Sequence, residues 1–198
     1  MSTECTKILL VRHGETRWNL ENRFQGGLNS DLTQHGRVQA KNLALNLSKV
    51  KIDKIYSSPA PRALETAHIL VNDRELHPIS INELREIELG PWEGLTKSEA
   101  EKLYPEQFSN FWTNPESFQL SGAETFSCLL NRVGQTIENL FNCHKGKNII
   151  IVSHWMSINA ALNYYSKNES KSYKNHYQIE NARAIELQRK QGETFFTL

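Results

Sequence analysis

Two short apolar runs rich in β-branched residues place the strongest constraint on how this chain can fold. They are Ile8–Val11 and Ile149–Val152, and both are bounded by polar residues. A run that is apolar on both faces is typical of a central strand in a parallel sheet that helices cover on both sides. Neither run is long enough to cross a bilayer. The chain is therefore expected to be an α/β protein built around a buried, mostly parallel sheet.

Weaker patterns predict the remaining elements. Helical spacing of apolar residues predicts helices that follow Thr33 and Ser58, each as an N-cap, and a long helix over about 124–141. Pro59 is expected in the first turn of the second helix, and Val38 on the buried face of the first. Further strands are expected at Lys54–Tyr56, Ile79–Ile81, Ala184–Leu187 and Phe195–Phe196, the last two paired. Strands that alternate with helices are typical of α/β architecture.

The length of 198 residues suits one domain over 1–198. Within it, the stretch of about 91–122 has several aromatic residues and prolines but no clear strand pattern, so it is predicted to be a helical and loop excursion that acts as a lid. The polar segment 167–174 is predicted to be a surface loop.

The balance of charge excludes several classes of protein. Lys and Arg number 23 and Asp and Glu number 22, which disfavours a nucleic-acid or membrane-surface protein. The three cysteines, Cys5, Cys128 and Cys143, form neither a disulfide framework nor a CxxC metal motif. The polar segment Met1–Lys7 lacks the apolar core of a signal peptide, so a cytoplasmic location is expected.

A histidine follows each apolar run at the same distance. His13 lies two residues past Val11, and His154 lies two residues past Val152. If both strands are central and parallel, their carboxyl ends meet at one edge, where ligands bind in open α/β sheets. Arg12 offers forked donors suited to phosphate oxygens. A neutral imidazole can attack phosphorus, and a charged one can stabilise the equatorial oxygens, so phosphoryl transfer is one interpretation of this edge. The residues alone leave another open, in which Arg12 and His13 belong to a solvated turn and His154 is a structural histidine.

Arg62 and a set of carboxylates extend this prediction. Arg62 falls in the first turns of the helix after Ser58, and a helix N-terminus favours anions. A leaving alkoxide needs a proton, and so a general acid. Physical reasoning does not choose among the available carboxylates, which are Glu83, Glu86, Glu88 and Glu93.

These blocks together resemble the histidine phosphatase superfamily, within its phosphoglycerate mutase-like branch. The resemblance runs in order through Leu10–Thr16, Trp18-Asn19, Arg23–Gly26, Ser57–Pro59 with Arg62, Glu86 with Leu89-Gly90 and Trp92–Gly94, and Val152–His154, and it covers nearly the whole chain. It implies a three-layer fold, a mixed but mostly parallel sheet flanked by helices, with the lid-like excursion arching over the site.

The resemblance also implies a role for each site residue. It makes His13 the residue that becomes phosphorylated, and it makes Glu86 the proton donor. The implied phosphate clamp is Arg12, Arg62 and His154, with Asn19 as a further contact and Gln25 and Gly26 touching the substrate. Trp155 departs from the family, which often has glycine or another small or polar residue there, and its indole is expected to narrow the substrate pocket.

The expected activity is hydrolysis of small soluble phosphomonoesters through a phosphohistidine, with no metal and no cofactor. Phosphoserine, α-ribazole phosphate, sugar phosphates and phosphoglycerates are the substrates that relatives suggest. One alternative is a cofactor-dependent phosphoglycerate mutase, which the short excursion disfavours. Another is a catalytically silent phosphate-binding module, which the complete set of site residues disfavours. The partner is thus a small phosphorylated metabolite, and because relatives of this size are often dimers, a homodimer is the expectation for assembly.

Overall fold

A computed structural model describes residues 5–71, 74–166 and 176–197 of the chain. The segment 167–174, predicted to be a surface loop, lies outside these residues. No helix within them is long and apolar enough to span a membrane.

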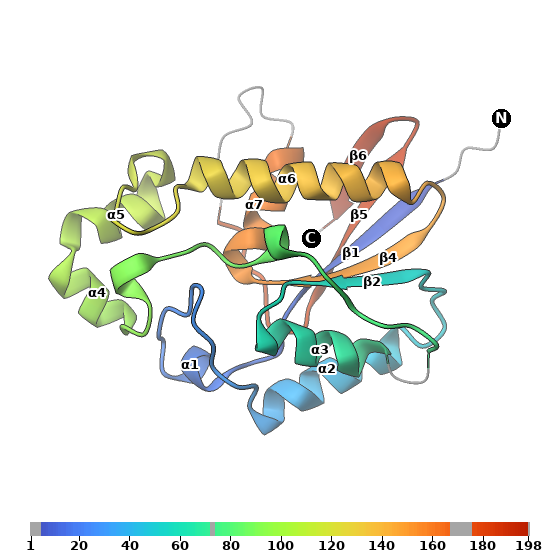
Figure 1. The fold of residues 1–198 in the computed structure, drawn as a ribbon, viewed down its shortest axis with the longest axis horizontal. Helices are drawn as coiled ribbons and strands as arrows, with labels where there is room; N and C mark the ends of the chain where they lie inside the picture. The colour runs from blue at the N-terminus through green and yellow to red at the C-terminus, as the bar shows by residue number, and fades with distance from the viewer. Residues whose placement is uncertain (1–4, 72–73, 167–175, 198) are drawn as a thin grey trace.

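One six-stranded sheet organises the described residues, in the order β3-β2-β4-β1-β5-β6 (Figure 1). The strands are β1 (Thr6–Arg12), β2 (Lys54–Ser57), β3 (Ile79–Ser80), β4 (Asn148–Ser153), β5 (Ala184–Lys190) and β6 (Glu193–Thr197). Strands β3, β2, β4 and β1 run parallel, and β5 and β6 continue the sheet in antiparallel pairing. The predicted mixed, mostly parallel sheet is confirmed, and so is the pairing of the last two strands.

Helices cover both faces of the sheet. Helices α2 (Gln34–Asn46) and α3 (Pro61–Val71) lie on one face, and α6 (Phe126–Cys143) and α7 (Trp155–Tyr165) lie on the other (Figure 1). Alternate residues of β1 enter different cores, since Ile8 and Leu10 pack with the α6 side whereas Leu9 and Val11 pack with the α2–α3 side. Runs that are apolar on both faces are what such a three-layer arrangement requires.

Two predictions about helices α2 and α3 are wrong in detail. Val38 is 41% exposed, because the buried face of α2 consists of Gly36, Ala40 and Ala44. The helix packs closely against the turn after β1, where a Cβ on Gly36 would lie 2.2 Å from the Glu15 carbonyl oxygen. Only small residues allow that approach.

The start of α3 also differs from the prediction. The helix begins at Pro61 rather than near Pro59. Ser58 is still part of the extended chain, since its backbone N–H donates to the Val152 carbonyl of β4 at 2.9 Å. Proline occupies the first helical position as predicted, but it is the second of the two prolines.

The segment after β3 is helical, as predicted, and contains no strand among its described residues. Its helices are α4 (Lys97–Leu103) and α5 (Pro105–Thr113), with 3-10 turns at Gly90–Trp92 and Pro115–Ser117. Trp92, Phe111 and Phe118 are at most 1% exposed and pack against one another. A 3-10 turn at Asn82–Leu84 and helix α1 (Arg17–Leu20) complete the described elements. The lid function of this segment and the single-domain organisation stay predictions.

Candidate active site

The two strand-end histidines lie side by side. Strands β1 and β4 are adjacent and parallel with Val11 opposite Val152, so both chains leave the sheet at the same edge. The backbone N–H of His13 donates to the Ser153 carbonyl at 3.0 Å, and the ring centroids of His13 and His154 are 5.2 Å apart. The rings are 3% and 0% exposed. The expectation that both imidazoles meet at the sheet edge is therefore met by the geometry.

The tautomer of His13 follows from its one close contact. Its Nδ1 lies 2.8 Å from the Gly14 carbonyl oxygen, which can only accept a hydrogen bond. Nδ1 must therefore carry the proton, and Nε2 keeps a free lone pair. Burial lowers the pKa of His13 well below its ordinary value, and the cations of Arg62 and Arg12 lower it further. The imidazole is thus neutral and able to act as a nucleophile at neutral pH.

His154 is equally buried but differently bonded. Its Nε2 is 2.7 Å from the Ser58 hydroxyl oxygen, and its Nδ1 is buried without a hydrogen-bond partner among the described residues. Burial lowers the pKa of His154 well below its ordinary value, with Arg62 and His13 adding to the effect. The His154 ring is therefore neutral at neutral pH. The sequence suggested Ser58 only as a helix cap and missed this contact.

These two pKa shifts predict how stability depends on pH. Both histidines have a lower pKa in the folded chain than the ordinary value of 6.5, so below pH 6.5 the unfolded chain binds more protons. The free energy of unfolding should thus fall as pH drops below that value. Each histidine contributes at most about 1.4 kcal/mol to this fall for each pH unit. Urea unfolding should show this loss when the free energy of unfolding is compared between neutral pH and a pH about one unit below the ordinary histidine pKa. It should be smaller in His154→Asn, and an identical loss in both proteins would contradict the shift assigned to His154.

Arg62, which is buried, and Arg12, which is half-buried, face the same space without a salt bridge to a carboxylate among the described residues. Arg62 donates to the carbonyl oxygens of Leu28 at 2.6 Å and Gly26 at 3.0 Å, and Arg12 donates to that of Ile179 at 2.7 Å. The Nε atoms of both arginines are buried and unpartnered, and neither arginine forms a salt bridge within the described residues. Burial lowers the pKa of each to about 10. Both arginines stay charged at neutral pH, and an anion bound between them would accept hydrogen bonds from their unpartnered N–H groups.

Among the four carboxylates that physical reasoning left open, Glu86, the one to which the resemblance pointed, lines the cavity. Its Oε1 accepts from the backbone N–H of Ile87 at 3.0 Å and of Ser157 at 3.1 Å, and its Oε2 accepts from the backbone N–H of Met156 at 3.2 Å. The last two donors belong to the first turn of α7, so the three hydrogen bonds hold the Glu86 side chain in one place at the cavity. Glu88, by contrast, is exposed and pairs with Arg85 at 3.1 Å.

Arg132 of helix α6 holds the backbone that carries Glu86. It donates to the carbonyl oxygens of Glu83 at 2.7 Å, Arg85 at 2.8 Å and Glu86 at 3.0 Å, and it forms a salt bridge with Glu124 at 2.6 Å. Its donors thus fix the loop before Glu86 onto α6. Sequence reasoning missed Arg132, because no local pattern links it to a loop more than forty positions earlier in the chain.

The remaining predicted site residues lie around the same space. The Oδ1 atom of Asn19 accepts from the Thr16 backbone N–H at 3.0 Å, and Gln25 donates through Nε2 to the Thr16 hydroxyl at 2.9 Å. The carbonyl oxygen of Gly26 is taken by Arg62, and its φ of +52° suits glycine. Asn181, which the sequence did not indicate, donates to the His13 carbonyl oxygen at 3.0 Å and to Asn19 Oδ1 at 3.3 Å.

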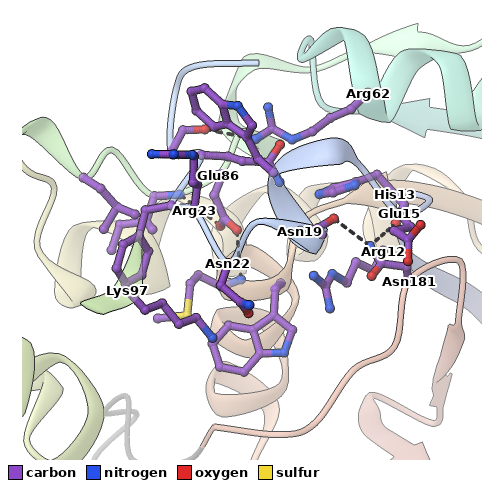
Figure 2. A pocket seen from close by; sticks show the side chains of 18 of the residues that line it. Arg12, His13, Glu15, Asn19, Asn22, Arg23, Arg62, Glu86, Lys97 and Asn181 are labelled. Atoms are coloured by element: carbon purple, nitrogen blue, oxygen red, sulfur yellow. Dashed lines mark hydrogen bonds between the residues drawn. The ribbon is translucent and has the colours of Figure 1, made fainter. Parts of the chain in front are cut away.

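A cavity of about 440 Å³ joins these residues to a second group of side chains. Figure 2 shows Arg62, His13 and Arg12 on one side of it and Lys97 on the other, with Glu86, Asn19 and Asn22 between them. Trp155 lines this cavity, as do Trp112 and His176. Within the described part of the chain, no three His, Cys, Asp or Glu side chains are grouped so that they could hold a metal ion.

Comparisons with known proteins show the family of the chain. The family model for the histidine phosphatase superfamily (branch 1) matches residues 8–198. The chain is 36% identical over 154 residues to phosphoserine phosphatase 1 of Hydrogenobacter thermophilus, covering 78% of the chain and 73% of that protein. It is 35% identical over 158 residues to a metal-independent phosphoserine phosphatase of Arabidopsis thaliana, covering 78% of the chain and 66% of that protein.

Solved structures show the same relationship over nearly the full chain. Bacillus stearothermophilus YhfR superimposes with a TM-score of 0.91 at 30% identity, covering 98% of this chain and 96% of that one. A mutant phosphoserine phosphatase of Entamoeba histolytica in complex with phosphoserine superimposes with a TM-score of 0.84 at 30% identity, covering 98% and 95%. The chain therefore belongs to branch 1 of the histidine phosphatase superfamily and is a phosphatase that acts on small phosphate esters.

Proposed function

We propose that this phosphatase hydrolyses phosphomonoesters through a covalent phosphohistidine on His13, with Glu86 as the general acid and then the general base. The observation that carries the proposal is the environment of His13. Its Nδ1 is committed to the Gly14 carbonyl, so the lone pair of Nε2 is free at a cavity that is lined by Arg12 and Arg62, whose Nε atoms have no hydrogen-bond partner among the described residues. A nucleophile with a matching set of oxyanion donors is the requirement for phosphoryl transfer.

In the first step, Nε2 of His13 attacks phosphorus while the bond to the leaving oxygen breaks. Glu86 gives its proton to that oxygen, so an alcohol leaves instead of an alkoxide. Arg12 and Arg62 stabilise the charge on the equatorial phosphoryl oxygens, which is where most of the catalysis of phosphoryl transfer arises. The unpartnered Nδ1 of His154 supports the same role, because a buried polar atom without a partner favours a ligand that completes its hydrogen bonding.

In the second step, water attacks the phosphohistidine from the side that the alcohol has left. Glu86, now a carboxylate, accepts a proton from this water, and the N–P bond breaks to restore neutral His13. Inorganic phosphate is released, and Glu86 is again protonated for the next turnover. The hydrogen bonds from Ile87, Met156 and Ser157 support this cycle, since they hold the carboxylate in one place in both steps.

Among substrates, phosphoserine is one that the comparisons suggest. Two similar proteins are phosphoserine phosphatases, and one solved relative holds phosphoserine. Another, at 31% identity, is an adenosylcobalamin/alpha-ribazole phosphatase. The cavity lining does not favour the mutase alternative, because among the described residues Lys97 is the one cation that the helical segment α4–α5 adds to it.

A phosphate-release screen in EDTA tests the proposed function. Phosphoserine, α-ribazole phosphate, sugar phosphates, 3-phosphoglycerate and p-nitrophenyl phosphate should be assayed in parallel, and we expect phosphate release from at least one of them without added metal. The same 3-phosphoglycerate reaction, primed with the bisphosphate, should be examined for 2-phosphoglycerate. Absence of phosphate release across the panel would refute the proposal, and formation of 2-phosphoglycerate would support the mutase instead.

A further inference from the structure

The cavity ends in aromatic side chains on the side away from the histidine pair. Trp112 of α5, Trp155 of α7 and His176 line it there, together with Lys97 of α4. In Figure 2, Lys97 points into this far region, opposite Arg62, His13 and Arg12. We call Trp112, Trp155 and His176 the aromatic wall. It comes from three separate parts of the chain, and its rings gather beside Lys97.

The rings of the aromatic wall are held in a defined arrangement. Trp155 and His176 stack nearly parallel, at 7° with centroids 5.6 Å apart. Trp112 is tilted against both, with its centroid 5.9 Å from Trp155 and 5.4 Å from His176. Nε2 of His176 lies 3.1 Å from the Phe111 carbonyl oxygen, which fixes the imidazole against α5. The wall is therefore preorganised, and its side chains would lose little conformational entropy when a ligand binds.

Lys97 fixes the third ring from the other side. Its ammonium group lies 5.3 Å from the centroid of Trp112, within the range of a cation–π interaction. Its backbone N–H donates to the Asn22 carbonyl oxygen at 2.9 Å, which anchors the backbone from which the lysine side chain extends. This arrangement keeps the Trp112 indole in position at the cavity.

The wall differs from the aromatic core of the same helical segment. Trp92 and Phe118 are at most 1% exposed and lie outside the cavity lining, whereas Trp112 and Trp155 are only half-buried and line the cavity. Aromatic surface left accessible inside a cavity is typical of a site that binds an organic group. A volume of about 440 Å³ also lies in the range for such ligands and exceeds what a phosphate alone would occupy.

We propose that the aromatic wall binds a flat, unsaturated organic group of the substrate, so that the preferred substrates are phosphomonoesters of alcohols that carry an aromatic or heteroaromatic ring. The inference rests on the proposed function for the position of the phosphate, which the histidine and arginine end of the cavity receives. Offset or edge-to-face contacts with Trp155 and Trp112 then favour a flat ring over a saturated group of similar size. Trp155 is thereby a specificity-determining residue.

Three esters of primary alcohols separate flatness from size and from the chemistry of the leaving group. They are ethyl, 2-cyclohexylethyl and 2-phenylethyl phosphate. We expect kcat/KM for the phenyl ester to exceed that for the cyclohexyl ester by about 3- to 10-fold, the range of aromatic pair contacts. Trp155→Leu should abolish this preference, and Trp155→Phe, which keeps a flat ring, should retain much of it. Phe195→Leu, an exposed position on β6 outside the cavity lining, should leave it unchanged.

Calorimetric binding of the same esters to His13→Ala gives a readout that does not need turnover. If no ester is hydrolysed but the phenyl ester binds more tightly, the proposed reaction fails and the aromatic wall stands. If the esters are hydrolysed with no preference for the phenyl ester, or if the preference survives in Trp155→Leu, the wall is overturned and the phosphatase stands. Trp112→Leu repeats the test should Trp155→Leu not fold, with loss of the preference again expected and its survival again overturning the proposal.

Discussion

Replacement of His13 by alanine is expected to lower kcat for every phosphomonoester by at least about 10⁴-fold, as loss of a nucleophile does in other covalent enzymes. The reason is geometric, because His13 is the imidazole whose Nε2 is free at the cavity, while His154 uses its Nε2 on Ser58. Loss of the nucleophile also removes the covalent intermediate. Wild-type protein quenched during turnover of a ³²P-labelled ester should carry label that is lost in acid and kept in alkali, as a phosphoramidate is.

The matched control is His35→Ala, since His35 is an exposed histidine at the start of α2, away from the cavity lining. It should keep wild-type kcat and wild-type labelling. Because His13 is buried, the melting temperature of His13→Ala should be measured beside its activity, so that unfolding is not mistaken for lost chemistry. A folded His13→Ala protein that still accumulates label would place the nucleophile elsewhere.

Replacement of Glu86 by glutamine is expected to affect poor leaving groups far more than good ones. Without the general acid, kcat for alkyl phosphates should fall by about 10²- to 10⁴-fold, the usual contribution of general acid catalysis. For p-nitrophenyl phosphate the loss should be much smaller, because nitrophenolate leaves without a proton. Parallel kcat measurements on phosphoserine and p-nitrophenyl phosphate give the ratio that decides the role.

Glu88→Gln is the control for this second prediction. Glu88 lies two residues away, is exposed and pairs with Arg85, so its replacement should change neither substrate's kcat. In Glu86→Gln, the amide nitrogen cannot accept the hydrogen bonds that the carboxylate accepts from Ser157 and Met156, and a modest loss of stability should accompany the change. Equal losses of kcat on alkyl and aryl esters would remove Glu86 from the acid role.

Much of the fold was predictable because burial leaves a pattern of apolar residues along the chain. Ile8–Val11 and Ile149–Val152 are apolar on both faces, and only a covered central strand has that requirement. The buried face of α2 was harder to predict. A large apolar residue such as Val38 suggested burial, but the close approach of α2 to the turn after β1 selects Gly36 and Ala40 instead. Steric fit between distant segments leaves no periodic signal.

The site divides in the same way. The sequence predicts that His13 and His154 each follow a buried strand, and parallel pairing of these strands brings their ring centroids to 5.2 Å from one another. The resemblance to a family pointed to Glu86, but the physical reason that Glu86 reaches the cavity lies in the tertiary structure, because contacts with the first turn of α7, seventy positions later in the chain, hold it there. The contacts of Arg132 and the aromatic wall likewise form only when separate segments of the chain pack together. Local patterns in a sequence report burial and element type, whereas a binding site depends on distances between segments that only the folded chain sets.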